Sequence, residues 1–142
     1  MTIYLDMDGV IADFFRAFAE KNNVKHWKSI KEKEKALVDL HNTDFFNNIP
    51  TFGDKTYKIV QKVRSLAYYV DAEWGICSSP LRGSNKHKYA VNKLTGKPNI
   101  LVDDKIDNIK KWEAAGGIGI LFQTDQDDIN DLFDKLENAC HS

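Results

Sequence analysis

The stretch Ile3-Tyr4-Leu5-Asp6-Met7-Asp8-Gly9-Val10-Ile11-Ala12-Asp13-Phe14 determines what fold and chemistry to expect of this chain. A short apolar run ends in two aspartates one residue apart, and a glycine follows at once. Carboxylates at the end of a buried strand are costly unless a cation meets them. A metal ion and a phosphate fit such a site, so the pattern favours phosphoryl transfer. The alternative, a pair of solvated turn aspartates, fits less well beside Gly-Val-Ile.

The composition is that of a single domain with room for a small insertion, because the chain has 142 residues. The formal net charge of −1 does not favour binding of duplex DNA or of an anionic membrane. No apolar run approaches membrane-spanning length. Cys77 and Cys140 lie far apart and no signal peptide precedes them, so we expect reduced thiols in a cytoplasmic protein. The histidines show no metal-ligand spacing.

Strands and helices alternate after residue 50, which predicts an α/β fold with an open parallel, Rossmann-like sheet and helices on both faces. The segment 15–52 has helical patterns but no strand, so we expect a small helical cap inserted after the first strand. Residues 1–14 and 53–142 would then form the core domain. The expected strands are 2–5, 73–77, 100–102 and 118–122. The expected helices are 12–21, 29–40, a turn at 44–46, 54–66 with Asp54 as N-cap, 84–94, 107–115 and 125–138.

Chemically useful residues follow three of these strands. Ligands of such sheets bind beyond the carboxyl ends of the strands, where Asp6, Ser78 and Asp103 fall. Asp6 and Asp8 can divide nucleophilic attack and proton transfer if their surroundings separate their pKa values. For Ser78 alone, a turn or capping role would be the ordinary interpretation.

The adjacent pair Asp103-Asp104 suits Mg²⁺, which prefers oxygen ligands. The competing interpretation is a cap for the next helix. A lysine from the run Lys86-His87-Lys88 can offset phosphoryl charge, although lysines are usually only solvated. Cys77 is expected to pack in the core, because no histidine is placed to activate it.

Taken in chain order, these motifs resemble the haloacid dehalogenase superfamily of phosphatases. More specifically, the segments DMDGVIADF, ICSSPLR, HKYAVNKL and ILVDDKIDN look like the 5'(3')-deoxyribonucleotidases and their compact bacterial and phage-type relatives. The resemblance spans residues 3 to 122, with a loose match in the cap. It implies a haloacid-dehalogenase-like sheet and an Mg²⁺-dependent phosphomonoesterase acting on deoxynucleoside monophosphates.

The resemblance also implies roles. Asp6 would be the nucleophile that forms an aspartyl-phosphate, and Asp8 would protonate the leaving oxygen and then activate water. Mg²⁺ would be held by Asp6, the backbone carbonyl of Asp8 and the pair Asp103-Asp104. The implied phosphate and substrate ligands are Ser78, Ser79, Arg82, Lys88 and, as the residue that stacks the base, Phe14. Lys88 is preferred within its lysine run because it matches the family's Lys-Tyr helix start.

The chain departs from the family pattern in two places. Fuller members of the family have an extra strand between the Lys-Tyr helix and the Asp-Asp strand, whereas here the short segment Gly96-Lys97-Pro98-Asn99 connects the two directly. In addition, Lys105 stands where arginine is common in the family. We therefore keep alternatives: the same chemistry on another small phosphoester such as a sugar phosphate, a receiver-like phosphorylatable signalling module, and a non-catalytic nucleotide-binding relative. The expected partner is a small-molecule nucleotide, and the expected state is a monomer or homodimer.

Overall fold

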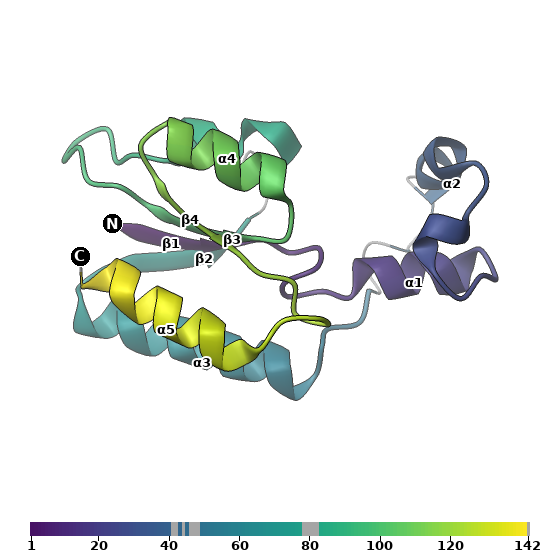
Figure 1. Ribbon diagram of the computed structural model, residues 1–142, viewed down its shortest axis with the longest axis horizontal. Helices are drawn as coiled ribbons and strands as arrows, with labels where there is room; N and C mark the ends of the chain where they lie inside the picture. The colour runs from purple at the N-terminus through teal and green to yellow at the C-terminus, as the bar shows by residue number, and fades with distance from the viewer. Residues whose placement is uncertain (41–42, 44, 46–48, 78–82, 142) are drawn as a thin grey trace.

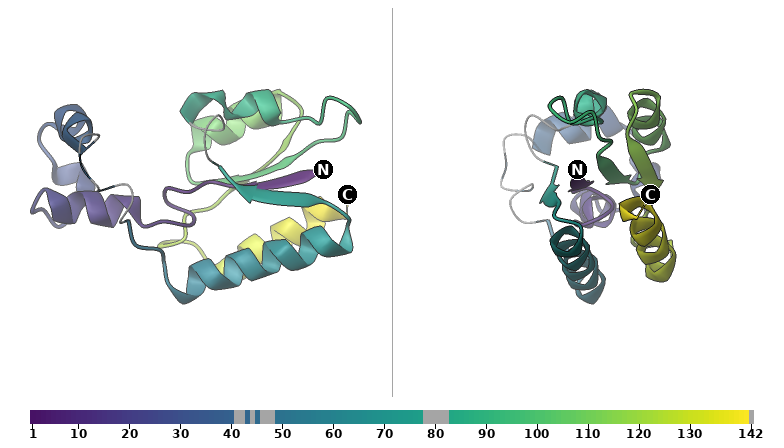
Figure 2. Two further views of the ribbon diagram at one scale, coloured as in Figure 1. Left: turned by 180° about the vertical axis from the view of Figure 1, so that it is seen from behind. Right: turned by 90° about the vertical axis from the view of Figure 1, so that its left-hand side faces the viewer.

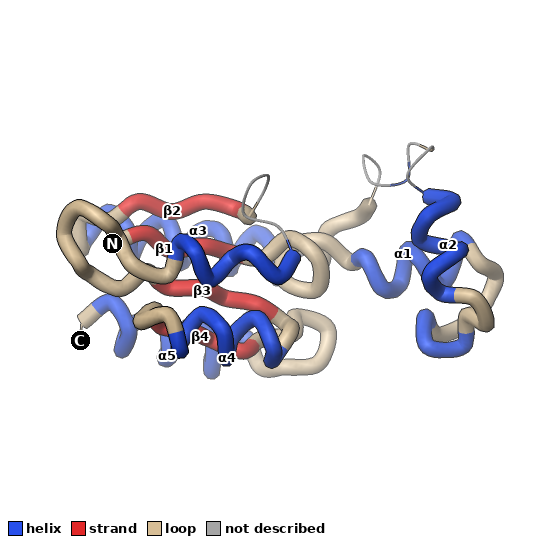
Figure 3. The backbone as a smooth tube through the Cα atoms, turned by 90° about the horizontal axis from the view of Figure 1, so that it is seen from above, coloured by secondary structure: helices blue, strands red, loops and turns tan. Residues whose placement is uncertain are grey.

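The computed structural model describes residues 1–142 except 41–42, 44, 46–48, 78–82 and 142. Within these residues, four parallel strands form one sheet in the order β2-β1-β3-β4 (Figure 1). The strands are β1 (Thr2–Leu5), β2 (Glu73–Ile76), β3 (Ile100–Asp103) and β4 (Ile118–Leu121). Figure 3 shows them side by side in that order. The predicted α/β class and parallel sheet are confirmed.

Helices cover both faces of the sheet. Helices α3 (Asp54–Tyr69) and α5 (Ile129–Cys140) lie against one face, whereas α4 (Ile106–Ala114) and the 3-10 helix η3 (Gly83–Tyr89) lie against the other (Figures 1 and 2). The remaining helices are α1 (Phe14–Lys21), η1 (Trp27–Ser29) and α2 (Lys33–Leu40). None of the helices in the described part of the chain is both long and apolar enough to cross a membrane.

The period-two alternation of the strands divides the core into two layers. Ile3 and Leu5 of β1 belong to the layer that contains α3 and α5, and the intervening Tyr4 packs in the layer of α4. Successive side chains of a strand point to opposite faces of the sheet, so a strand that is apolar at every position packs against a hydrophobic layer on each face. On the α4 side, the fully buried Trp112 meets Tyr4 edge-on at 5.8 Å between ring centroids.

Helices α1 and α2 lie beyond the carboxyl ends of the strands, apart from the sheet and its covering helices (Figure 1). They have a hydrophobic cluster of their own, built on the buried side chains of Phe14, Phe18, Ile30 and Leu40. The two connections to the core run antiparallel, with a bridge between Ala12 and Thr51. We call residues 14–50 the helical segment; the domain boundary at residue 15 stays a prediction.

Three expected helices differ from the observed ones. The predicted helix over 29–40 is a short 3-10 turn followed by α2. The last helix begins at Ile129 rather than at residue 125, because the Asp128 side chain accepts the N–H of Asn130 and caps it there. Helix α3 has Gly53 as its N-cap, with φ of 66°, so Asp54 is its first residue and not the predicted cap. The predicted turn at 44–46 falls largely outside the described residues.

The predicted helix over 84–94 is also wrong beyond Tyr89. The chain there forms the 3-10 helix η3, and Val91 then bridges Pro98 in antiparallel fashion. The Asn92 side chain accepts the backbone N–H groups of Leu94 and Thr95. Such local side-chain bonds compete with helical ones, and they win at this position.

Candidate active site

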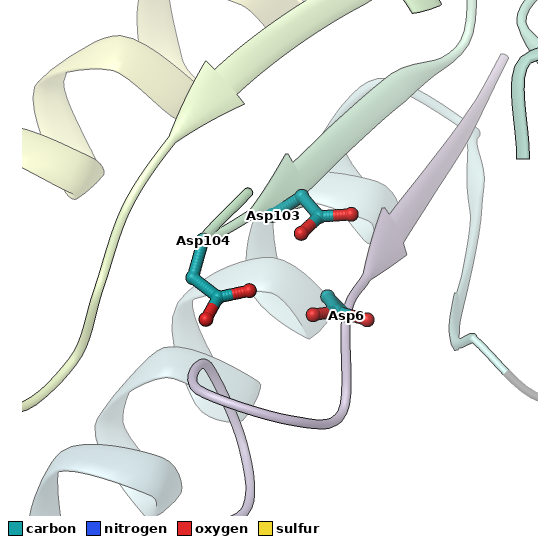
Figure 4. Close-up of side chains that lie close together, drawn as sticks. All are labelled: Asp6, Asp103 and Asp104. Carbon is teal, nitrogen blue, oxygen red and sulfur yellow. The ribbon is translucent and has the colours of Figure 1, made fainter. Parts of the chain in front are cut away.

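Three carboxylates from two adjacent strands meet at one edge of the sheet. Asp6 follows β1, Asp103 ends β3 and Asp104 comes next, and one oxygen of each lies within 4.8 Å of the others (Figure 4). Strand β1 pairs with β2 on one side and β3 on the other, so the chain reverses its direction of winding here. Open parallel sheets bind ligands at such a reversal point. The sequence-based expectation that these distant acidic residues converge is confirmed.

A buried lysine links two of the three carboxylates. Lys86 Nζ donates to Asp6 Oδ1 at 2.6 Å and to Asp103 Oδ2 at 2.7 Å, and the residue is only 4% exposed. Burial lowers the pKa of Lys86, but the charge of Asp6 and the hydrogen bonds to both carboxylates outweigh burial and raise the pKa above its ordinary value. Lys86 therefore remains a cation at neutral pH.

The lysine that contacts Asp6 is therefore Lys86 and not the predicted Lys88, and the predicted contact of Lys88 with the phosphate stays a prediction. Lys88 is exposed, whereas Lys86 reaches Asp6. Residues two apart in a 3-10 helix lie on different faces, because such a helix has three residues per turn. The α-helix expected from the sequence could not reveal which lysine of the run faces the carboxylates.

Asp103 is the anchor of the cluster and is completely buried. Its Oδ2 accepts from Lys86 and from Asn108 Nδ2, at 2.7 and 3.1 Å, and its Oδ1 accepts the backbone N–H of Lys105 at 3.0 Å. A buried carboxylate is tolerated when it is paired and hydrogen-bonded in this way. Asn108 was not singled out from the sequence, although it lies in the ILVDDKIDN segment.

Asp6 and Asp104 are the other two carboxyl groups of the cluster. The single positive charge of Lys86 does not offset the negative charge of all three carboxylates. Burial, followed by the charge of Asp103, raises the pKa of Asp6 to about 6 despite Lys86. Burial, followed by the charges of Asp6 and Asp103, raises the pKa of Asp104 to about 8. A further cation near these oxygens would favour the ionised forms of both groups. The donor set, carboxylate oxygens alone, fits a hard divalent ion such as Mg²⁺.

The loop after β1 requires glycine at position 9. Gly9 has φ of 87°, and a Cβ added there would lie 2.2 Å from Asp104 Oδ2. The backbone of the Asp6–Gly9 turn thus passes directly against the Asp104 carboxylate. Any side chain at position 9 would push these two parts of the site apart.

Thr124, which the sequence analysis missed, holds this loop from the other side. Its backbone N–H donates to the Gly9 carbonyl at 3.1 Å, and its hydroxyl donates to the Val10 carbonyl at 2.6 Å. The residue is completely buried. No sequence signal marks it, because the contact joins residues more than 110 positions apart.

A cleft of about 830 Å³ extends from Asp104 towards the helical segment. Its wall on the helical segment includes Arg16, Lys25 and Lys28. The wall on the core includes Lys105 and Asp125 as well as Asp104. The cleft therefore connects the carboxylate cluster to a surface with several positive charges.

Of the remaining predicted site residues, the structure describes Asp8 and Phe14. Asp8 is half-buried in the loop, and its charge contributes to the raised pKa of Asp6, so the two aspartates are neighbours. Phe14 is buried in the helical segment, stacked on Phe18 at 5.4 Å and in edge contact with Phe45. Its predicted stacking against a base stays a prediction. The predicted residues Ser78, Ser79 and Arg82 lie outside the described part of the chain.

Cys77 packs in the core, as predicted. It is buried in the layer of Tyr4 and Trp112, and burial raises the pKa of its thiol to about 12. The reactive form of cysteine is the thiolate, so this side chain is not a nucleophile near neutral pH. Among the described groups at this edge of the sheet, the carboxylates and Lys86 are the ones that can carry the chemistry.

Comparison with known proteins identified no relative of this chain. Neither a protein-family model, nor a curated protein, nor a solved structure matches the chain. The motifs of the sequence and the geometry of the site are therefore what indicates a function.

Proposed function

We propose that this protein is an Mg²⁺-dependent phosphomonoesterase of the haloacid dehalogenase type that works through an aspartyl-phosphate. The observation that supports this most directly is the meeting of Asp6, Asp103, Asp104 and Lys86 at the reversal point of a parallel sheet. Nucleoside monophosphates are the substrates that the sequence motifs favour.

The metal ion would be held by the carboxylates of Asp6 and Asp104, whereas both oxygens of Asp103 already accept hydrogen bonds. The predicted ligand from the backbone of Asp8 completes the proposed set. When bound, the ion supplies positive charge that reduces repulsion between Asp6 and the phosphate dianion.

Asp6 is the proposed nucleophile because it combines a central position with a cationic partner. Lys86 at 2.6 Å favours its ionised form, which is the form that attacks. An Asp6 oxygen forms a bond to phosphorus while the bond from phosphorus to the ester oxygen breaks. Asp8 gives its proton to the departing alcohol. It then takes a proton from the water that attacks phosphorus, and this second displacement regenerates the Asp6 carboxylate and releases phosphate.

Asp8 also bears on the receiver-like alternative, in which the phosphoaspartate is stored rather than hydrolysed. A neighbouring carboxyl that can act as acid and then base promotes turnover. The cleft of about 830 Å³ beside Asp104 provides space for a leaving group, which a stored phosphate does not need. Both observations favour hydrolysis.

A second substrate class, small phosphoesters such as sugar phosphates, is favoured by the cleft lining. Large apolar side chains are missing from the described residues that line it. A pocket for a planar base ordinarily includes apolar or aromatic surface.

The test is phosphate release from a panel of nucleoside monophosphates and sugar phosphates, with and without Mg²⁺. We expect turnover that EDTA removes and added Mg²⁺ restores. Asp6→Asn should abolish turnover, whereas Asp134→Asn, an exposed aspartate on α5, should leave it unchanged. Hydrolysis by Asp6→Asn would refute the nucleophile. A long-lived phosphoprotein formed with acetyl phosphate, without repeated turnover, would favour the receiver-like alternative.

A further inference from the structure

The cleft beside Asp104 has two walls of different charge. The wall on the side of the helical segment contributes the cations Arg16, Lys25 and Lys28, and Asp13, which directly precedes that segment, adds one carboxylate. Asp13 already pairs with Arg16 Nε at 3.0 Å. With histidine counted as neutral, the described residues of this wall carry three formal positive charges and one negative charge. Lys25 and Lys28 are both exposed residues.

The opposite wall does not neutralise this excess. Lys105 and Asp125 on the core wall offset each other formally, and Asp104 belongs to the carboxylate cluster that would hold the metal ion. A substrate whose phosphate reacts at Asp6 would therefore extend from a metal-bound end towards a cationic end. Complementary charge at the second end would strengthen binding and attract the substrate from solution.

The uncharged residues that line the cleft also favour a hydrophilic substrate. Among the described residues of the lining, the only apolar side chain is Ala19 and the only ring is His26. Phe14 faces Phe18 and Phe45 inside the helical segment rather than lining this cleft. The surface is thus suited to a hydrophilic leaving group more than to a stacked base.

We propose that the preferred substrate is a phosphomonoester whose alcohol portion carries a second anionic group, a phosphate or a carboxylate, recognised by the Lys25 and Lys28 wall. This inference rests on the proposed phosphatase function and specifies its substrate class. Removal of the reacting phosphate leaves the second group on the product, because that group lies at the cationic end and not at Asp6.

Two matched substrate pairs separate the effect of charge from the effect of the base. One pair is a hexose bisphosphate and the corresponding hexose monophosphate. The other is a nucleoside 3',5'-bisphosphate and the corresponding nucleoside 5'-monophosphate. A phosphorylated hydroxy acid and its uncharged analogue test a carboxylate as the second group. We expect kcat/KM to be about tenfold higher for the doubly charged member of each pair, and this preference to shrink as salt rises.

The variant Lys25→Gln/Lys28→Gln should lower kcat/KM for doubly charged substrates by about tenfold and change it less than twofold for monophosphates. The matched control, Lys31→Gln/Lys35→Gln, removes two exposed lysines of the helical segment that do not line the cleft, and it should leave the preference intact.

The possible results distinguish the two proposals. Hydrolysis of monophosphates and bisphosphates at equal rates, or equal losses in the two double variants, would overturn the charge-recognition inference and leave the phosphatase proposal standing. A nucleoside monophosphate that is preferred over every doubly charged substrate would do the same. No hydrolysis of any phosphoester by the wild type would overturn the phosphatase proposal and, with it, the inference that rests on it.

Discussion

Replacing Lys86 by Gln tests the reasoning about the site most directly. The change removes the cation that contacts Asp6 at 2.6 Å and Asp103 at 2.7 Å, and it leaves two close carboxylates in a buried position. Removal of one partner from a buried ion pair costs about 3 to 5 kcal/mol. Lys88→Gln is the matched control, because that lysine lies two residues away and is exposed.

The size of the loss should depend on pH. Lys86 stays charged throughout the accessible range, whereas Asp6 has a pKa of about 6 when Lys86 is present. At about pH 8 the variant must accommodate ionised carboxylates without their cation. At about pH 5 much of Asp6 is already protonated, so the destabilisation by Lys86→Gln should be smaller there.

Urea unfolding followed by tryptophan fluorescence measures this difference, because Trp112 is completely buried. With a slope of about 2 kcal/mol per molar urea, a loss of about 4 kcal/mol lowers the midpoint by about 2 M. We also expect phosphatase activity to fall by about 100-fold or more, since a positioned cation at the reacting charge is lost. Equal midpoints and equal activities for Lys86→Gln and Lys88→Gln would refute the assignment of Lys86.

Three further predictions concern the same edge of the sheet. Without Mg²⁺, the free energy of unfolding should fall as pH rises from about 4 to 8, because the raised pKa values of Asp6 and Asp104 stabilise the folded state only while these groups bind protons. The two-unit shift of Asp6 alone corresponds to about 3 kcal/mol, and saturating Mg²⁺ should flatten the slope; a metal-independent slope would count against the cluster. Gly9→Ala should weaken Mg²⁺ binding about tenfold or more in calorimetry, since its Cβ would lie 2.2 Å from Asp104, whereas Gly75→Ala, with no atom within 4 Å of the added Cβ, should not. Thr124→Val should lower the free energy of unfolding by about 1 to 3 kcal/mol, because it leaves a buried carbonyl unpaired; unchanged thermal unfolding would show that this hydroxyl does not hold the loop.

The sequence alone predicted the parallel α/β sheet and the convergence of its acidic residues. Strand residues such as Ile3 and Leu5 are apolar on both faces, and this pattern is local, so it can be read without knowing the neighbours. The position of the site was also predictable, because residues at the carboxyl ends of parallel strands lie at the same edge of the sheet. That rule predicts from the sequence alone that Asp6 lies beside Asp103 and Asp104, as the structure shows.

Only the tertiary structure determined which residues complete the site. Lys86 and Lys88 belong to one short run, and the choice between them depends on a 3-10 helix whose direction is fixed by packing. Thr124 and Asn108 act through contacts that no local pattern encodes. The cleft with its lysine-bearing wall likewise forms where the helical segment faces the core. The sequence gives the order of these two parts along the chain, but it does not give their relative position in space. Periodicity reports burial along one element, whereas hydrogen bonds and surface charge depend on how elements meet in three dimensions.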